Sequence, residues 1–325
     1  FSVNLHRWQF KNNIIMKNTL YIILLSSLIF TQDRNIGYNL YLDDLINYLK
    51  NNYTTNNVLS YNSARDILYG EIDKINGQVK GIYTNYAVTL PGNVDPSTHL
   101  YENGIDCEHL WPQSMGSSSS PMKSDMHHLR PCKSTVNSSR GNKPFNEIND
   151  YQTDNWYWLS NNSSSIPSNN IDEYSESKSG SFEPREDRKG DIARALFYFY
   201  TIYNNVADDN FFQIQKNILY QWHVQDQVDS NELQRTWTIA SYQNNIPNPF
   251  IVDSSLVERA YFYEFLLLGD SNLDNVVNIV DVILIVGYIL GNENLSNDQF
   301  INSDLNNDSV ININDIVSII EIILS

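Results

Sequence analysis

The sequence is poor in the basic residues that usually bind polyanions. Its 325 residues contain 21 Lys and Arg against 38 Asp and Glu, which gives a net charge of −17 at pH 7. This balance excludes a uniformly basic surface, the usual means of attracting phosphate groups. The deficit is uneven, because residues 266–325 contain nine acidic and no basic residues. The rest of the chain carries −17 + 9 = −8, and a bound metal ion would add positive charge that this count omits.

Long hydrophobic runs are also scarce, which excludes a protein with several membrane spans. The one candidate lies in residues 16–30, MKNTLYIILLSSLIF, where a lysine precedes the apolar run and polar residues follow it. This arrangement predicts a secretory signal peptide over residues 16–32, with residues 1–15 an extension upstream of an initiating methionine. A buried or anchoring helix is the alternative, since no small-x-small cleavage site follows Phe30. We therefore expect a secreted, monomeric mature protein without a membrane segment.

The hydropathy pattern predicts mixed helix and strand at the start of the chain and mainly helices in its second half. Helical spacing covers residues 42–52 and 63–70, whereas residues 78–89 alternate like strands. Residues 160–181 are rich in Ser and Asn and are predicted to form a surface loop. Further helices are expected over residues 191–203, 210–222, 230–242 and 254–268. The predicted fold class is therefore α+β.

The last part of the chain contains two copies of an oxygen-rich loop, 34 residues apart. Oxygen side chains alternate along each copy, as required to surround one Ca²⁺ together with a backbone carbonyl at the seventh position. The residues at positions 1, 3, 5, 7, 9 and 12 are Asp270, Asn272, Asp274, Val276, Asn278 and Asp281, then Asp304, Asn306, Asp308, Val310, Asn312 and Asp315. An apolar helix follows each loop, over residues 279–290 and 313–324.

This duplicated loop and helix resembles the dockerin module. Unlike an EF-hand, each loop has Asp at position 12 and leaves little room for a helix before it. The resemblance implies a small all-α, calcium-binding domain over residues 268–325 with a cohesin-like protein as partner. From the helical pattern before it, a larger domain is expected over residues 33–267. The alternative is a pair of Asn/Asp-rich turns without metal, in which four or more carboxylates would crowd together without a counter-charge.

The residue types that carry chemistry gather in two segments, IDCEHLWPQS at 105–114 and SDMHHLRPCKSTVNSSRGN at 124–142. Glu108 and His109 are adjacent, so on a strand their side chains point to opposite sides. One can hold a metal while the other faces a substrate water only if the backbone turns there. Pro112 favours an early end to this strand.

A helix of about ten residues is expected in the second segment, from Pro131 to just before Gly141. On it Lys133, Asn137 and Arg140 have the spacing i, i+4, i+7 and share one face. That face offers an amide oxygen for a metal and two cations for phosphate. Taken alone, Asn137 or Arg140 would be interpreted as an ordinary solvated helix residue.

Together these motifs resemble the bacterial endonuclease I family, whose active site is a ββα-metal, or His-Me, finger. The resemblance implies that His109 is the general base that takes a proton from the attacking water. It implies that Glu108 and Asn137 bind one Mg²⁺ or Mn²⁺, which stabilises the transition state. A near-neutral imidazole suits such a base at physiological pH. The expected reaction is hydrolysis of DNA, with RNA as a second candidate, to 5′-phosphate and 3′-hydroxyl ends.

Two later segments extend the resemblance to roughly residues 40–262. They are FEPREDRKGDIARA at 182–195 and the stretch from Trp222 to Phe250. Arg140 matches a family arginine near the phosphate, so it is expected to be part of the catalytic site and to bind substrate. Some members carry a further phosphate-stabilising arginine on a long insertion between the two motifs, but residues 115–123 here are short and contain none. Lys133 and Arg130 are the other candidates for substrate binding.

Two internal links are expected. Cys107 and Cys132 are the only cysteines, and each lies in one of the two motifs that must meet at the metal. A cysteine pair in an exported protein is more often bridged than free, and a bridge closing about 25 residues would stabilise by ~3 kcal/mol on the chain-entropy model. Metal coordination by the two thiols is the alternative. Arg194 and Glu183 are expected to form an internal ion pair.

The remaining histidines do not form a recognisable metal site. His127 and His128 are adjacent, and neighbours on a strand face opposite ways, so one of them is interpreted as a buried scaffold residue. His99 and His223 have no partner pattern and are expected to be structural or exposed.

Two other functions are compatible with the sequence. One is a catalytically silent nucleic-acid-binding protein that docks to a scaffold, against which the joint presence of Glu108, His109 and Asn137 argues. The other is a metal-dependent phosphodiesterase for small or lipid substrates, which only the family resemblance excludes. No helix-turn-helix or zinc finger is recognisable in the sequence. Backbone recognition with little sequence specificity is therefore expected.

Overall fold

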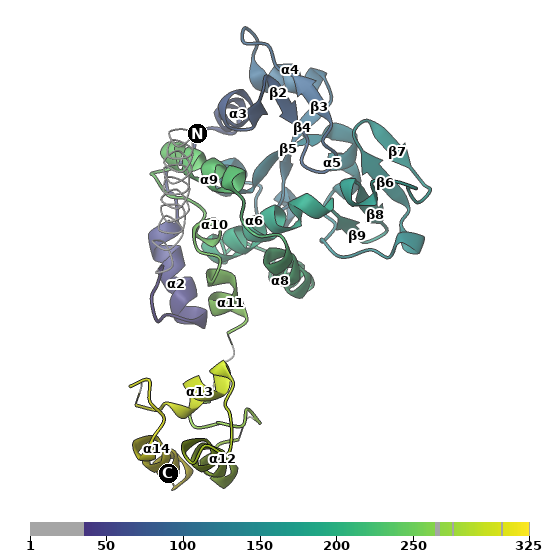
Figure 1. Cartoon of the computed structure of the whole chain (residues 1–325). Helices are drawn as coiled ribbons and strands as arrows, with labels where there is room; N and C mark the ends of the chain where they lie inside the picture. The colour runs from purple at the N-terminus through teal and green to yellow at the C-terminus, as the bar shows by residue number, and fades with distance from the viewer. Residues whose placement is uncertain (1–35, 264–266, 275, 307, 325) are drawn as a thin grey trace, which may run out of the picture. The chain divides into compact units, whose positions relative to one another are not determined.

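The computed structural model describes residues 36–263, 267–274, 276–306 and 308–324 (Figure 1). The predicted signal peptide over residues 16–32 and the extension over residues 1–15 lie outside the described residues. The chain forms two compact units, Phe1–Phe262 and Tyr263–Ser325. This division lies a few residues before the boundary expected after residue 267.

The first unit begins with helices and a small sheet. Helix α2 (Leu42–Tyr53) is amphipathic and buries Leu45 and Leu49. Helix α3 (Tyr61–Ile67) is capped by the side chain of Ser60 and continues as the π-helix η1 (Leu68–Ile72). Strands β1 (Lys74–Ile75), β2 (Gln78–Lys80) and β3 (Ala87–Thr89) form an antiparallel sheet in that order, followed by helix α4 (Pro96–Glu102). These elements confirm the helices and strands predicted before residue 90.

An antiparallel hairpin followed by a short helix carries both chemical motifs of the first unit. Strand β4 (Ile105–His109) pairs with β5 (Leu129–Lys133), and helix α5 (Ser134–Arg140) follows β5 directly. The helix ends at Gly141, whose φ of +56° suits glycine. The connection between the strands contains three short 3-10 helices, η2 (Gln113–Met115), η3 (Met122–Ser124) and η4 (Met126–His128). The result is the ββα arrangement that the family resemblance implied.

The helix start predicted at Pro131 is wrong, because this proline lies within β5 opposite Cys107. Its carbonyl accepts a hydrogen bond of 2.8 Å from the Ile82 N–H, on the side away from β4. The nitrogen and carbonyl of one strand residue point to the same side. The N–H that proline lacks would therefore not have bonded to β4, and the strand tolerates it.

A four-stranded antiparallel sheet with the order β7-β6-β8-β9 follows α5. Its strands are β6 (Asn155–Trp158), β7 (Asn161–Ser163), β8 (Ser175–Lys178) and β9 (Ser181–Glu183). The surface loop predicted over residues 160–181 is therefore wrong in part, since β7 and β8 lie within it. Serine is buried here through hydrogen bonds: the Ser175 hydroxyl donates to the Tyr83 carbonyl at 2.7 Å and accepts from the Arg185 N–H at 3.0 Å.

Helix α6 (Lys189–Ile202) forms the centre of the larger core, and thirteen of its fourteen residues are buried. Figure 1 shows it running beside α8, with which it makes extensive contacts. The other helices of this half are α7 (Asp209–Gln213), α8 (Lys216–Gln225), α9 (Ser230–Tyr242), α10 (Pro249–Val252) and α11 (Leu256–Tyr261). The single helix predicted over 210–222 is thus divided between α7 and α8. Short 3-10 helices are η5 (Asp150–Gln152), η6 (Ile171–Glu173) and η7 (Glu186–Arg188).

The C-terminal unit contains three helices among its described residues: α12 (Ile279–Ile289), α13 (Asn297–Ser303) and α14 (Ile313–Leu324). Helices α12 and α14 follow the two oxygen-rich loops as predicted. Helix α13 directly precedes the second loop, so the expected lack of an entering helix is wrong there. A small core holds the unit together, formed by Val282, Ile285, Ile311, Ile316 and Ile319. In neither unit does a described helix combine the length and apolar content needed to cross a bilayer.

Candidate active site

Glu108 is a buried carboxylate near the end of β4. Only 2% of the residue is exposed, and its Oε1 accepts a hydrogen bond of 2.6 Å from the Tyr83 hydroxyl. The same oxygen lies 3.2 Å from Nη1 of Arg140, with which it forms an ion pair. Burial raises the pKa of Glu108, while the charge of Arg140 and the hydrogen bond from Tyr83 act in the opposite direction. An additional cation beside this carboxylate would favour its ionised form further.

His109 is the last residue of β4, and one of its ring nitrogens is fixed by the backbone. Nε2 lies 3.0 Å from the Lys123 carbonyl oxygen, which can only accept, so the proton is assigned to Nε2. Nδ1 then carries the lone pair, and the side-chain nitrogen of Gln113 lies 3.4 Å from it. Burial lowers the pKa of His109 to about 3, with smaller contributions from His128, Lys123 and Arg140. The ring is therefore neutral at pH 7 and accepts protons through Nδ1.

Glu108 and His109 lie on opposite faces of the hairpin, as adjacent strand residues must. Glu108 faces Tyr83 and Arg140. The ring of His109 lies 5.4 Å from that of Tyr61 and 5.5 Å from that of His128, measured between centroids. The two residues are thus held in place by different neighbours.

Asn137 lies on α5, next to β4. Its Nδ2 donates to the Cys107 carbonyl at 3.4 Å, which directs the amide oxygen away from that carbonyl. The Asn137 amide and the Glu108 carboxylate are hard oxygen donors of the kind that Mg²⁺ and Mn²⁺ prefer. Within the described ranges, no group of three His, Cys, Asp or Glu side chains is placed to hold a metal ion. A divalent cation here would therefore depend on this carboxylate and amide, completed by water and phosphate oxygens.

Arg140 is completely enclosed by the protein. Its Nη1 and Nη2 donate to the carbonyls of His109 and Leu110, at 3.1 and 2.8 Å. The guanidinium also lies 4.5 Å from the centroid of the Phe145 ring. Since no part of the side chain is exposed, a substrate phosphate can contact it only if this arrangement opens. In this position Arg140 ties the end of β4 to α5 and balances the charge of Glu108.

Lys133 and Arg130, the other expected phosphate-binding cations, are engaged elsewhere. Lys133 is the residue before α5, and its Nζ donates to the Ser160 carbonyl at 2.7 Å. Arg130 is buried, with Nη2 3.5 Å from Oδ2 of Asp191. Burial lowers the pKa of Arg130 to about 10. Arg130 therefore points into the protein.

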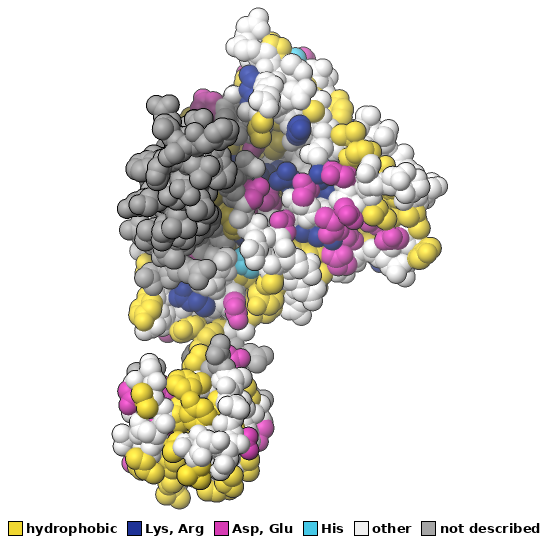
Figure 2. All heavy atoms as spheres, in the orientation of Figure 1, with side chains coloured by type: hydrophobic (Ala, Val, Ile, Leu, Met, Phe, Trp, Pro, Cys, Tyr) yellow, Lys and Arg dark blue, Asp and Glu magenta, His cyan; other side chains and the backbone are white. Residues whose placement is uncertain are grey.

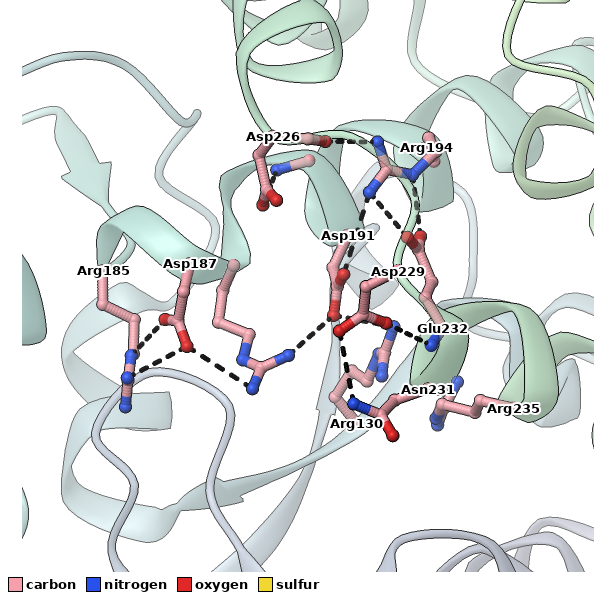
Figure 3. Close-up of polar contacts among 12 residues, drawn as sticks. Arg130, Arg185, Asp187, Asp191, Arg194, Asp226, Asp229, Asn231, Glu232 and Arg235 are labelled. Atoms are coloured by element: carbon pink, nitrogen blue, oxygen red, sulfur yellow. Dashed lines mark hydrogen bonds and ion pairs between the residues drawn. The ribbon is translucent and has the colours of Figure 1, made fainter. Parts of the chain in front are cut away.

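Figure 3 shows Arg130 within a network of ion pairs around the first turns of α6. Arg194 donates from Nε and Nη2 to the carboxylate of Glu232, at 2.8 and 2.6 Å. The expected ion pair between Arg194 and Glu183 is wrong, because Glu183 instead lies 2.8 Å from Nζ of Lys189. The ion pair between Arg194 on α6 and Glu232 on α9 thus connects residues 182–195 with the stretch from Trp222 to Phe250, the two later segments that resemble the family.

The predicted disulfide is also wrong, because Cys107 and Cys132 are both free and buried. In the β4–β5 ladder Cys107 is opposite Pro131, whereas Cys132 is opposite Asp106. This offset of one residue places the two thiols on opposite faces of the hairpin. They pack in different cores as a result. Burial raises the pKa of Cys107 to about 12 and also raises that of Cys132, so neither thiol is poised to bind a metal.

The described histidines outside the motif are His99, His127, His128 and His223, and they bond to backbone carbonyls. The Nε2 atoms of His127 and His128 lie 2.9 and 2.7 Å from the carbonyls of Ile246 and Met122, and both rings are buried. His223 is buried as well, and His99 is bonded through Nε2 to the backbone. A buried scaffold histidine was expected at one of positions 127 and 128, and both are buried.

The two oxygen-rich loops of the C-terminal unit share one hydrogen-bond pattern. The carboxylate at position 1 accepts from the N–H at position 5, at 3.0 Å in the first loop and 3.1 Å in the second. The carboxylate at position 12 accepts from the N–H at position 9, at 2.8 Å in both. These four carboxylates are buried: Asp270, Asp281, Asp304 and Asp315. Because the unit contains no Lys or Arg, a bound cation would compensate their charge.

Four residues around the site escaped the sequence analysis, namely Tyr61, Tyr83, Gln113 and Lys123. Gln113 and Lys123 lie in the connection after His109, where an amide four residues beyond this histidine was an available signal. Tyr83 lies 25 residues before Glu108, and Tyr61 lies earlier still. No local pattern links these two tyrosines to the motif.

Comparisons with known proteins agree with this geometry. Residues 37–255 match the family described as endonuclease I, and residues 268–324 match the dockerin type I domain. The extracellular ribonuclease of Bacillus subtilis (strain 168) is 36% identical over 190 residues, covering 51% of this chain and 58% of that protein. The extracellular ribonuclease of Bacillus amyloliquefaciens is 34% identical over 163 residues, covering 44% and 49%. The chain spans about half the length of these curated relatives. It belongs to the endonuclease I family and carries a dockerin type I domain at its C-terminal end.

Proposed function

We propose that this chain is a secreted, divalent-metal-dependent endonuclease that hydrolyses the phosphodiester bonds of nucleic acids. The observation that carries the proposal is the hydrogen bond of 3.0 Å between His109 Nε2 and the Lys123 carbonyl. It leaves Nδ1 as a neutral acceptor with a fixed direction, which a general base requires. The names of the two Bacillus relatives support an extracellular location.

In this proposal His109 takes a proton from the attacking water at Nδ1. The Gln113 amide, 3.4 Å from Nδ1, is a weak partner that a water molecule can displace. When the ring becomes protonated, its Nε2–H continues to donate to the Lys123 carbonyl. The ring therefore keeps its orientation during the proton transfer.

Glu108 and Asn137 would hold Mg²⁺ or Mn²⁺. Both neighbours of Glu108 contact Oε1, and Asn137 uses its Nδ2, so each residue has another oxygen for a cation. The bound ion would supply positive charge that stabilises the transition state and the leaving 3′ oxygen. Arg140 is then a positioning residue, because it holds the backbone at His109 and balances Glu108.

The proposed products are 5′-phosphate and 3′-hydroxyl ends, and the proposed substrates are RNA and DNA. The word ribonuclease in the names of both relatives favours RNA. On the face of the first unit seen in Figure 2, basic side chains are interspersed with acidic ones. On this face we expect substrate binding at local cation sites, which contact the phosphate backbone and not the bases.

The C-terminal unit is proposed to bind one Ca²⁺ in each loop and to attach the enzyme to a cohesin-like protein. The buried carboxylates of both loops support the first part. Exposed apolar side chains on α12 and α14 support the second, for example Ile283 at 63% and Ile313 at 64% exposure.

The test is cleavage of supercoiled plasmid, single-stranded RNA and bis(p-nitrophenyl) phosphate by the purified mature chain, with Mg²⁺ or with EDTA. We expect Mg²⁺-dependent cutting of nucleic acid that falls at least about 100-fold in His109→Ala. His99→Ala removes a histidine outside the motif, on helix α4, and is expected to keep full activity. Cleavage of the small ester alone would replace the proposal with a small-substrate phosphodiesterase. No cutting by the wild type with Mg²⁺ or Mn²⁺ would leave a silent binding protein.

A further inference from the structure

Among the described residues of the first unit, almost every arginine pairs with a carboxylate of the protein. Eight arginines lie in the described residues, and seven of them pair with a carboxylate within 4.0 Å. These seven are Arg130, Arg140, Arg185, Arg188, Arg194, Arg235 and Arg259. The exception is Arg65 on α3. Arg130 and Arg140, which were predicted from the sequence to bind substrate, are among these seven. Substrate phosphates would therefore need other cations.

Arg65 and Lys123 both contact the ring of Tyr61, which lies beside His109. Cζ of Arg65 is 4.7 Å, and Nζ of Lys123 is 5.2 Å, from the centroid of the Tyr61 ring. That ring is 5.4 Å from the His109 ring. The Lys123 carbonyl also holds Nε2 of His109. Two cations, one on α3 and one on η3, thus contact the aromatic ring that lies next to His109.

Neither cation is neutralised by a carboxylate. Arg65 donates from Nη2 to the neutral Asn62 amide at 2.7 Å, and its buried Nε has no hydrogen-bond partner. Lys123 takes part in none of the ion pairs of the described residues. The charge of Arg65 reaches Asp95, but hydrogen bonds from Thr98 are the main cause of the lowered pKa of that carboxyl. Both cations thus lie at the Tyr61 ring without a carboxylate partner, and a bound phosphate would supply the missing negative charge.

We propose that Arg65 and Lys123 bind backbone phosphates of the substrate strand on the His109 side of the hairpin. The proposal rests on the nuclease function proposed above and names the residues that position its substrate. Tyr61 contributes by contacting both cations with its ring through cation–π interactions.

The test measures binding of a fluorescein-labelled single-stranded RNA to the mature chain in EDTA, by fluorescence anisotropy over a series of salt concentrations. We expect Arg65→Gln and Lys123→Gln each to weaken binding about tenfold. Each variant should also reduce the slope of log Kd against log salt concentration by about 0.7, the value for one phosphate contact on a single strand. In kinetics with Mg²⁺, KM should rise with little change in kcat.

Three matched variants separate a phosphate contact from a structural role. Arg65→Lys and Lys123→Arg keep the charge and should retain the salt slope of the wild type. Lys50→Gln removes a charge on α2, where Lys50 bonds to Asn204, and should leave binding unchanged. If Arg65→Gln does not fold, the partly exposed Lys123 carries the test alone.

The outcomes distinguish the two proposals. An unchanged salt slope in a folded Arg65→Gln/Lys123→Gln variant of an active enzyme would overturn the phosphate-binding pair and leave the nuclease function standing. A wild type that neither binds nor cuts RNA or DNA would overturn the nuclease function itself.

Discussion

Nη1 of Arg140 lies 3.2 Å from Oε1 of Glu108, and both side chains are closed off from solvent. Removing one partner would leave an unpaired charge in a buried position, which costs about 3–5 kcal/mol. We therefore expect Arg140→Gln to lower the free energy of unfolding by about 3 kcal/mol. The double variant Glu108→Gln/Arg140→Gln should recover part of this loss, because it removes the orphaned carboxylate. Urea unfolding measures both.

Arg188→Gln is the control for this prediction. Arg188 also pairs with an aspartate, but 35% of its side chain is exposed. Its replacement should cost less than about 1 kcal/mol, as is usual for exposed ion pairs. Equal losses in Arg140→Gln and Arg188→Gln would contradict the positioning role of Arg140.

The stability of the first unit should fall in mild acid, partly because of His223. Burial lowers the pKa of His223 to about 4, against an ordinary value of 6.5. Between these values the unfolded chain binds a proton that the folded chain does not. The stabilisation present above pH 6.5 is therefore lost as the pH falls towards 4, by about 1–2 kcal/mol at pH 5. Urea unfolding at pH 7 and pH 5 measures this loss.

His223→Gln keeps an amide that can donate to the Ser254 carbonyl, the partner of His223 Nε2. The variant should lose less stability than the wild type between pH 7 and pH 5. An identical loss in both proteins would show that His223 does not contribute, and that the other buried histidines with lowered pKa values, His109, His127 and His128, account for the effect.

Two thiols per chain should react with Ellman's reagent after unfolding without reductant. Cys107 and Cys132 lie on opposite faces of the hairpin and are free. In the native protein both are buried and protonated, so their reaction should be slow. A reductant should leave the unfolding midpoint unchanged, because no bridge is broken. Fewer than one reactive thiol in the unfolded chain would restore the disulfide that the sequence suggested.

Removing calcium should unfold the C-terminal unit and spare the first one. The unit combines four buried loop carboxylates with a complete lack of Lys and Arg. Without a cation, these charges repel each other in a buried environment. We expect the full chain in EGTA to lose part of its helical circular dichroism and to regain it when Ca²⁺ is added.

Asp281→Asn keeps the size of the side chain and removes one loop charge, so it should need a higher Ca²⁺ concentration to recover the helical signal. Glu293→Gln is the matched control, since this glutamate is exposed and outside both loops. Identical melting curves in EGTA and in Ca²⁺ would contradict calcium binding by the loops.

The parts of the fold that could be predicted from the sequence are those set by local patterns. The period of apolar residues was sufficient for α2 and α9, because these helices bury one face. The repeat in the C-terminal part was sufficient for α12 and α14. In the site, Glu108, His109 and Asn137 lie on one hairpin and the helix that follows it, so their proximity depends on a short stretch of chain.

Pairing between distant segments could not be predicted in this way. Whether Cys107 faces Cys132 depends on the register of β4 against β5, and a shift of one residue decides it. From the sequence, Arg130 was a candidate for binding substrate phosphate. In the structure it instead forms an ion pair with Asp191 on α6. Arg65 was not predicted to belong to the site. It lies before the motif in the sequence, and its link to His109 is the ring of Tyr61, which contacts both residues.

The alternation along β4 also restricts how this protein can change its length. Cys107, Glu108 and His109 face alternate sides of the hairpin, so deleting one residue earlier in the strand would exchange the sides of the carboxylate and the imidazole. Deleting two would restore them. Within this strand, related sequences should therefore differ in length before Glu108 only by even numbers of residues. In the connection over residues 110–128, insertions and deletions of odd or even length should both occur.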